Sequence, residues 1–377
     1  MLIYTINLGI VMLFSFLAEY YKDKGKGLKK DGTKLPLIQF TMIAILSLSL
    51  ISGLRFFVGT DYLIYVAMYA DVRAHGLFTP TLDSIEIGYR VISWLFGQVF
   101  VSPFAFLFAV AVFTQVGMIM CLRRHAEIFW LACTLYILIM MYYSTFNIIR
   151  QTIACVIIFV GHRYIVSGNF KKYLLVILIA FLFHSSSLIM IPVYFLAKSD
   201  AWSKRITICF FATLLLWILY PYWAPTVMGV LSDSNYGSYA DTMAKGESGA
   251  NLVRLGVTFA PAFVGFIFRK RLVEKFPEMN IAINMTALKF FIMIFSMKDI
   301  YFARMAVFMQ VYVYLLLPGV VNIFEDKKTR FFFAAMFVAL FGIYHYILLP
   351  SEGGVIPYQT IFEVPWDWSV TDRMVIW

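Results

Sequence analysis

Residues 53–69 read GLRFFVGTDYLIYVAMY, and this stretch decides how the chain is organised. It begins inside the apolar segment 35–57, carries Arg55 near the end of that segment, turns at Gly59 and continues from Asp61. Three tyrosines then follow at near-helical spacing: Tyr62, Tyr65 and Tyr69. Arginine and tyrosine are typical of a membrane edge, where they anchor a helix. An arginine, a glycine turn and a carboxylate in one stretch also indicate part of a binding site.

The composition predicts a membrane protein. The 377 residues are 62% hydrophobic and only 14% charged, whereas a soluble domain of this size needs far less apolar surface. Helices that cross a bilayer need about 20 apolar residues each. The net charge of +10 would indicate nucleic acid if the cations shared one soluble face, but they lie in short connectors between apolar runs. We therefore predict an all-α polytopic membrane protein that contacts the lipid bilayer and binds no nucleic acid.

The basic connectors predict the orientation in the membrane. Six lysines follow the first apolar run, so the connector that holds them is expected on the cytoplasmic side and the N-terminus outside. Continuing along the chain, we expect about ten transmembrane helices with both termini outside. Their expected ranges are 2–20, 35–57, 103–121, 128–146, 147–163, 206–223, 252–268, 281–297, 300–320 and 331–349. We expect residues 1–377 to form a single domain.

Four regions do not fit a simple crossing. Residues 58–102 are too polar to cross and are expected to form re-entrant or amphipathic helices on the outer surface. The segment 172–197 has basic residues at both ends, so one crossing would break the charge rule. Two half-length helices that meet near His184 would satisfy it, and we favour such a hairpin with an outward tip, while a single crossing stays open. Residues 224–250 and 350–377 are expected to form an outer loop and an outer C-terminal tail.

This topology places several charged residues at one level, near the outer ends of their spans. The arginines at that level are Arg55, Arg150, Arg254 and Arg304, and the other polar residues are Asp61, Glu86 and His184. A charge near the bilayer centre costs roughly 2.5–3.5 kcal/mol and less near an interface, so each arginine could simply reach toward water. Because the four arginines lie at one depth with no acidic partner in the same spans, we expect at least two of them to face a shared outer cavity. Guanidinium groups suit phosphate, which they bind through two parallel hydrogen bonds. The expected ligand is a lipid-linked pyrophosphate.

Each of the other polar residues also has a structural interpretation. His184 could be a hydrogen-bonding group among its serine neighbours, Glu86 could pair with Arg90 one turn later, and Asp61 could cap the helix that follows it. Lys289 lies in the middle of an expected span, and the sequence offers no explanation for it. The histidine and cysteine spacings predict no metal site, and no cofactor motif is present. The four cysteines are expected to be small core residues: Cys121, Cys133, Cys155 and Cys209.

Several short motifs occur in an order that resembles the EpsG-like branch of the Wzy-type polysaccharide polymerases, over about residues 53–362. They are GLRFFVGTDY, EIGYR, FNIIRQTIA, FHSSSLIMIPVYF, ARMAVF followed by LLLP, and IPYQTIF. The resemblance implies a membrane glycosyltransferase that polymerises O-antigen (lipopolysaccharide) or exopolysaccharide repeat units carried on undecaprenyl pyrophosphate. It implies a site on the outer, periplasmic side of the bacterial cytoplasmic (inner) membrane, and a chain-length regulator protein as a further partner. The matched positions are Arg55, Asp61, Glu86, Asn147, Arg150, Gln151, His184 and Arg304.

The resemblance also implies roles for these residues. Pyrophosphate is already a good leaving group, so the enzyme has to neutralise the charge that develops on it, which suits the four arginines. The candidates for the catalytic base are Glu86, Asp61 and His184. We favour His184 with Glu86 in support, because a carboxylate among arginines has a lowered pKa, whereas histidine titrates near neutral pH. The substrate-binding candidates are Asn147, Gln151, Tyr65 and Tyr358, with Tyr236, Tyr239 and Trp366 as further surfaces on which a sugar could stack.

Two other functions stay open. A lipid-linked oligosaccharide flippase or other transporter should show paired halves, and the sequence shows no internal symmetry. A glycosyltransferase that uses a polyprenyl-monophosphate sugar would place acidic residues in the first outer loop, often with a metal. Asp61 and Glu86 keep that second alternative open.

Overall fold

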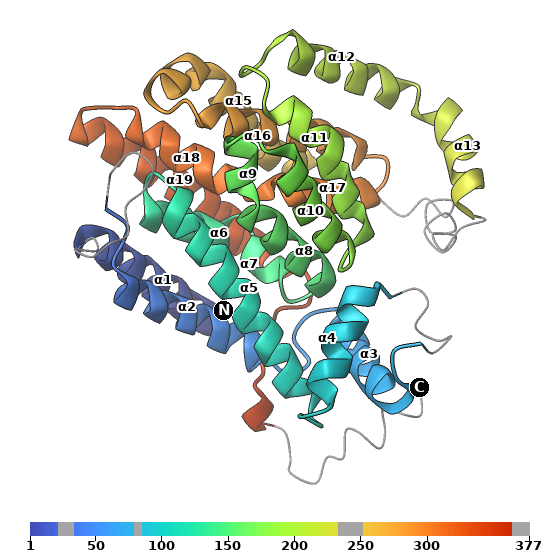
Figure 1. The fold of residues 1–377 in the computed structure, drawn as a ribbon. Helices are drawn as coiled ribbons and strands as arrows, with labels where there is room; N and C mark the ends of the chain where they lie inside the picture. The colour runs from blue at the N-terminus through green and yellow to red at the C-terminus, as the bar shows by residue number, and fades with distance from the viewer. Residues whose placement is uncertain (22–33, 79–84, 233–251, 364–377) are drawn as a thin grey trace. The chain divides into compact units, whose positions relative to one another are not determined.

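The computed structural model describes residues 1–21, 34–78, 85–232 and 252–363 (Figure 1). Within these ranges the chain forms helices and no β-strand, and one isolated bridge pairs Arg55 with Thr360. The predicted all-α fold is therefore confirmed. The helices gather into two compact units that alternate along the chain. Unit 1 holds Met1–Val160, Leu178–Ser185 and Phe324–Trp377, and unit 2 holds Gly161–Ile177 and Ser186–Ile323. The expectation of a single domain stays a prediction.

Unit 1 is a bundle in which α1 packs against α2 and α6, α2 packs against α5, and α5 packs against α8 (Figure 1). The C-terminal helix α19 packs against α6, which is almost entirely buried. Two shorter helices, α3 and α4, pack against each other, and α3 also contacts α5. The helices of unit 1 are α1 (Leu2–Tyr21), α2 (Ile38–Gly53), α3 (Tyr62–His75), α4 (Ile87–Gly97), α5 (Pro103–His125), α6 (Phe129–Leu138), α7 (Met141–Ser144), α8 (Ile149–Val160), α19 (Lys327–Leu348) and η3 (Ile361–Glu363).

Unit 2 is built around α16, which contacts α11, α12, α15, α17 and α18. Most of the residues of α16 are buried, as expected of a helix that is apolar on every face. The helices of unit 2 are α9 (His162–Val166), α10 (Phe170–Phe181, whose last residues belong to unit 1), η2 (Ser185–Ile189), α11 (Met190–Ala197), α12 (Lys204–Ile218), α13 (Tyr220–Ser232), α15 (Leu252–Lys275), α16 (Met279–Phe295), α17 (Tyr301–Gln310) and α18 (Val313–Asn322).

The expected number of ten crossings is not confirmed. Among the described residues, four helices (α1, α5, α15 and α19) are long and apolar enough to span a membrane, and up to six spans result if two bent pairs each count as one. Those pairs are α12 with the start of α13, bent by 80°, and α17 with α18, bent by 45°. The expected span 128–146 is broken at Met140, whose φ is 67°. All ten expected ranges do fall on helices, but hydropathy does not detect such breaks, which a membrane protein tolerates where other helices cover them.

The predicted outer loop and tail are described only in part. The first residues of the range 224–250 continue α13 up to Ser232, so this part is helical rather than a loop. Residues 233–251, with Tyr236 and Tyr239, and residues 364–377, with Trp366, lie outside the described residues. The helices expected between residues 58 and 102 are present as α3 and α4. Their position on the outer side stays a prediction.

The predicted hairpin over 172–197 is confirmed. The ring of Phe170 at the start of α10 lies 4.8 Å from that of Phe195 near the end of α11, measured between centroids. Tyr173 stacks on Tyr194 at 5.4 Å. Because the start of one helix meets the end of the next, the chain reverses between them, and His184 lies in the turn. The outward direction of this turn stays a prediction.

The chain after α19 returns to the loop that follows α2. We call residues 353–361 the tail segment. Four main-chain hydrogen bonds join it to residues 54–60: Gly59 N–H to Gly354 O (2.9 Å), Thr60 N–H to Gly353 O (3.1 Å), Phe56 N–H to Gln359 O (2.9 Å) and Ile361 N–H to Leu54 O (3.0 Å). The side chain of Asn147 adds a fifth bond, from Nδ2 to Gly353 O at 2.8 Å. The tail segment is therefore part of unit 1.

Two glycines make this contact sterically feasible. Gly59 has φ 106° and Gly353 has φ 60°, which a residue with a Cβ adopts only with strain. A Cβ on Gly59 would lie 2.6 Å from Asn147 Oδ1, and one on Gly353 would lie 2.5 Å from Asn147 Nδ2. The amide of Asn147 thus fills the space that both glycines leave open.

We predict that Gly59→Ala and Gly353→Ala each lower the stability of the purified protein in detergent, by roughly 1–3 kcal/mol, because each adds backbone strain and a clash. Gly342→Ala on α19 is the matched control, since a Cβ there meets no atom within 4 Å and alanine favours a helix. Thermal unfolding followed by circular dichroism measures the three variants. A Gly59→Ala protein as stable as the wild type would show that the tail segment is not held in this way.

Candidate functional site

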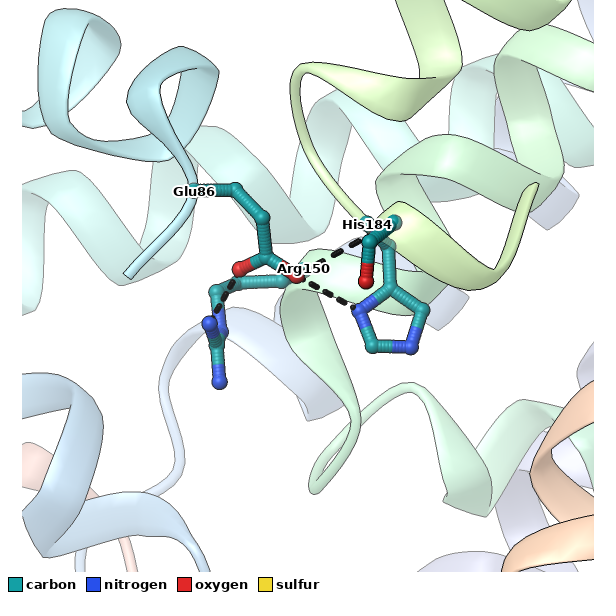
Figure 2. Close-up of polar contacts among 4 residues, drawn as sticks. Glu86, Arg150 and His184 are labelled. Atoms are coloured by element: carbon teal, nitrogen blue, oxygen red, sulfur yellow. Dashed lines mark hydrogen bonds and ion pairs between the residues drawn. The ribbon is translucent and has the colours of Figure 1, made fainter. Parts of the chain in front are cut away.

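The carboxylate of Glu86 lies between the side chains of Arg150 and His184 (Figure 2). One oxygen, Oε2, forms an ion pair with Nη1 of Arg150. The other, Oε1, is 3.0 Å from Nδ1 of His184 and also accepts the backbone N–H of Ser185 at 3.4 Å. The three side chains are 17%, 21% and 15% exposed, respectively, so this cluster is largely withdrawn from solvent. All of its residues belong to unit 1.

A glycine contact brings the two halves of the cluster together. Glu86 directly precedes α4, and His184 lies in the turn after α10. The backbone N–H of Gly88 donates to the carbonyl of Leu182 at 2.7 Å. A Cβ on Gly88 would lie 2.5 Å from that carbonyl oxygen, so only glycine allows the start of α4 to approach the turn this closely. Gly88 was not a candidate from the sequence; it is part of EIGYR, but its partner lies far along the chain.

The surroundings of Glu86 decide its charge. Burial by itself raises the pKa of this carboxyl, but the hydrogen bond with His184 and the positive charge of Arg150 together outweigh burial, and the pKa falls below the ordinary glutamate value. Glu86 is therefore ionised at neutral pH, and both of its oxygens only accept hydrogen bonds. It follows that Nδ1 of His184 carries the proton that it donates to Glu86. The lone pair of the neutral imidazole is then on Nε2.

Arg150 starts α8 and has a second polar neighbour. The hydroxyl of Tyr65 on α3 contacts the Arg150 side chain, and the ring of Tyr65 lies 5.8 Å from that of Tyr89 on α4. Nε of Arg150 is buried and makes no hydrogen bond within the part of the chain that the structure describes. Arg150 therefore holds Glu86 through one nitrogen and keeps a donor for another acceptor. Tyr65, a predicted substrate-binding residue, lies beside the cluster.

Arg55 is placed differently from Arg150. It is 2% exposed, and its three guanidinium nitrogens donate to the backbone carbonyls of Val58 (3.2 Å from Nε), Ser52 (from Nη1) and Phe146 (3.1 Å from Nη2). The guanidinium also lies over the rings of Phe146 and Tyr62, 4.9 and 5.6 Å from their centroids. These contacts hold the turn after α2 against α7. They favour a structural role for Arg55 over the expected contact with pyrophosphate.

Asp61 does not cap α3, and Glu86 does not pair with Arg90, although the sequence left both of these structural roles open. Asp61 does precede α3, but its side chain makes no capping hydrogen bond; its Oδ1 accepts from the Thr60 hydroxyl at 3.2 Å. Glu86 contacts Arg150 and His184, while Nη1 of Arg90 donates to the carbonyl of Leu77 at 3.0 Å. Asp61 therefore contacts Thr60, and Glu86 contacts Arg150 and His184, which the spacing of residues along the helices did not predict.

Three predicted substrate-binding residues lie in the scaffold around the cluster. Asn147 accepts the backbone N–H of Asp61 at 3.4 Å through Oδ1 and donates to Gly353 through Nδ2, so its amide joins two loops. Gln151 is 2% exposed within α8. The hydroxyl of Tyr358 donates to the carbonyl of Ile51 at 3.0 Å. The contacts of Asn147 and Tyr358 explain these two residues as structural supports. Binding of substrate by all three residues stays a prediction.

The two remaining arginines belong to unit 2. Arg254 lies on α15 and Arg304 on α17, where its guanidinium is 5.3 Å from the ring centroid of Tyr301. The structure thus brings together Glu86, Arg150, His184 and Tyr65 within unit 1. Arg254 and Arg304 stay predicted ligands of the pyrophosphate.

We predict that the stability of the wild-type protein falls as the pH drops from about 6 to about 3, in part because Glu86 becomes protonated. A carboxyl whose pKa is lowered in the folded state adds stability above its unfolded pKa and loses that stability as the pH falls through the folded pKa. Glu86→Gln removes this contribution and flattens the curve. Gly88→Ala should flatten it too, because it forces Glu86 away from His184.

Chemical unfolding at a series of pH values measures this effect, with Glu274→Gln on α15, an exposed glutamate, as the matched control. The control should follow the wild-type curve. If Gly88→Ala lost as much stability on acidification as the wild type, the close approach of α4 to Leu182 would not be what holds Glu86.

No curated protein and no solved structure matches the chain significantly. The model of the EpsG family matches residues 38–360, a range that includes the whole Glu86 cluster and the tail segment up to Thr360. This match covers most of the chain and confirms the resemblance that the motifs indicate. The chain belongs to the EpsG family.

Proposed function

We propose that this protein is a polysaccharide polymerase, a glycosyltransferase that moves a glycan from an undecaprenyl-pyrophosphate-linked donor onto an acceptor repeat unit. Membership of the EpsG family supports a polymerase-like function, and several helices are apolar and long enough for a multi-pass membrane protein. The observation that carries the proposal is the position of Glu86, an ionised carboxylate held by Arg150 on one side and bonded to His184 on the other. This arrangement suits a histidine that accepts a proton.

In the proposed reaction, the acceptor sugar hydroxyl attacks the anomeric carbon of the donor. The new bond forms between that oxygen and the anomeric carbon, and the bond from this carbon to the pyrophosphate oxygen breaks. The electron pair of the broken bond leaves with the pyrophosphate, and the hydroxyl proton moves to Nε2 of His184. The imidazolium that forms is stabilised by the Glu86 carboxylate at Nδ1, as a carboxylate does for histidine in other general-base pairs.

Arg150 has two tasks in this proposal. Its Nη1 keeps Glu86 ionised. We assign to its guanidinium, whose Nε has no hydrogen-bond partner among the described residues, the stabilisation of the negative charge that develops on the leaving group. Because the Glu86–Arg150 pair is neutral as a whole, further positive charge is needed for the two phosphates. The reaction as written needs no metal ion. Asp61 is the alternative carboxylate for orienting the acceptor.

The reaction is placed on the outer, periplasmic face of the cytoplasmic membrane. The distribution of basic connectors supports this location. Basic connectors favour the cytoplasmic side, and the candidate site is expected at the opposite side of the membrane. The lipid-linked repeat unit would then enter from the outer leaflet, where a chain-length regulator protein could also act.

We predict that a strain lacking this protein makes surface polysaccharide of a single repeat unit in place of a ladder on a gel. Wild-type protein should restore the ladder and His184→Ala should not, with a loss of about a hundredfold in rate for a lost general base. Arg150→Lys should lose most activity because a point charge cannot replace the guanidinium fork. His75→Ala is the matched control, since this exposed histidine pairs with Asp71 in α3, away from the cluster.

Purified enzyme with a lipid-linked repeat unit gives the rates of His184→Ala, His184→Gln and Glu86→Gln. If His184→Ala kept more than about a tenth of the rate, the histidine would not be the base and Glu86 would take that role. Complete loss of polysaccharide from the deletion strain, repeat unit included, would indicate a flippase or a transferase that uses a monophosphate-linked sugar.

A further inference from the structure

Lys289 is a buried cation in the core of unit 2. It lies on α16, the helix that contacts most of the others in this unit, and is 7% exposed. The other long polar side chain buried in α16, Asn284, is well satisfied: it donates to the carbonyl of Ser199 at 2.7 Å and accepts the backbone N–H of Trp202 at 3.2 Å. A charge in such an apolar helix is costly, and in membrane proteins it usually marks a functional site.

The contact that Lys289 makes does not compensate its charge. Its Nζ lies 3.3 Å from the hydroxyl of Thr258 on α15, which is itself 5% exposed. That hydroxyl uses its own proton to donate to the carbonyl of Arg254 at 2.9 Å, so it accepts from Lys289. An ammonium has three donors, and among the described residues the structure pairs only one of them, with a neutral oxygen. Two of the three donors are left for a ligand.

The end of unit 2 where Lys289 lies is positively charged. Helices α15 and α17 both begin there and α16 ends there, as the packing of their residues in one cluster shows: Leu255, Ile292, Met293, Ile300, Ala303 and Ala306. The first turns of α15 and α17 carry Arg254 and Arg304, and these two helix N-termini add partial positive charge against the partial negative charge of the one C-terminus, that of α16. One acidic residue, Asp299, follows the end of α16; its Oδ1 accepts the backbone N–H of Tyr301 at 2.9 Å, and its Oδ2 has no hydrogen-bond partner among the described residues. The balance at this end favours an anion.

The groups around Lys289 also fit a lipid. The face of α15 next to this end presents exposed apolar side chains, among them Leu252, Val253 and Phe259, as a lipid-facing helix does. A ligand that combines a negative headgroup with apolar chains would satisfy both the ammonium and this face. Free phosphate would lose its water without gaining apolar contact.

We propose that Lys289 and Thr258 form a binding site in unit 2 for the phosphate group of a membrane lipid. The ammonium donates to the phosphate oxygens, and the Thr258 hydroxyl holds the ammonium in place by accepting one of its hydrogen bonds. Arg254 and Arg304 at the same end add to the positive field. Arg254 and Arg304 are also the predicted ligands of the donor pyrophosphate, so this inference rests in part on the proposed function. The lipid-binding test of Lys289→Met and the rate of His184→Ala separate the failure of one from the failure of the other.

Binding can be measured on the purified full-length protein in detergent, by native mass spectrometry and by thermal stability with added lipid. The probes are undecaprenyl phosphate, phosphatidylglycerol, diacylglycerol as a neutral lipid and inorganic phosphate. We expect an anionic lipid to bind and to raise the unfolding temperature, and Lys289→Met to weaken this binding at least tenfold. Lys289→Arg should keep most of it, and Lys270→Met, an exposed lysine at the other end of α15, should bind as the wild type does.

The same experiment contains the outcomes that overturn the proposal. Equal lipid binding by Lys289→Met and wild type would remove Lys289 from the site, and equal stabilisation by inorganic phosphate or diacylglycerol would exclude a lipid phosphate. A response to undecaprenyl phosphate alone would identify the carrier lipid, whereas a response to phosphatidylglycerol as well would identify anionic lipid in general. In the absence of lipid, Lys289→Met should be at least as stable as the wild type, because it removes a buried polar group with two unpaired donors.

Should Lys289→Met fail to fold, Thr258→Val gives the second test. Valine has nearly the same shape as threonine but no hydroxyl, so it should weaken lipid binding several-fold while the protein stays folded. If a folded Thr258→Val protein bound the anionic lipid as tightly as the wild type does, the proposed site would be contradicted.

Discussion

Glu86 is a largely buried carboxylate, and the cost of burying its charge determines how the surrounding chain is arranged. Arg150 supplies the opposite charge and His184 the hydrogen bond, so that the carboxyl stays ionised although burial opposes this. Removal of either partner would leave a charge without compensation, which is far costlier than replacing the whole pair. The imidazole is consequently held in one tautomer, and this constraint makes His184 suitable for accepting a proton.

The scaffold around the cluster relies on close backbone contacts at glycines. Gly88 lets α4 meet the turn that carries His184, and Gly59 lets the loop after α2 meet the tail segment. Arg55 donates hydrogen bonds to the carbonyls of Val58 and Phe146, and Asn147 donates one to the carbonyl of Gly353. These bonds join the loop after α2 to the chain before α8 and to the tail segment. The C-terminal region is thus part of the structure that positions the start of α8 and, with it, Arg150.

Hydropathy and charge were enough to predict the helical membrane fold and the hairpin at His184, because both follow from local patterns. The breaks at Met140 and between α12 and α13 depend on local backbone geometry and were missed. Residue type and motif were enough to select the members of the cluster. Their contacts could not be predicted, because they depend on the close approach of Gly88 to Leu182, which lies far along the chain. Arg55 shows the limit most clearly: a guanidinium satisfied by carbonyls and one that binds phosphate look the same in a sequence.

In the proposed site, Glu86 acts through His184 and not on the substrate by itself. A double-mutant cycle on purified enzyme tests this, with the rates of Glu86→Gln, His184→Ala and the double variant measured at one pH on a lipid-linked repeat unit. If the two residues act as a unit, the double variant should be no slower than His184→Ala alone. If the two losses multiply, Glu86 and His184 contribute independently and the account of the site is wrong.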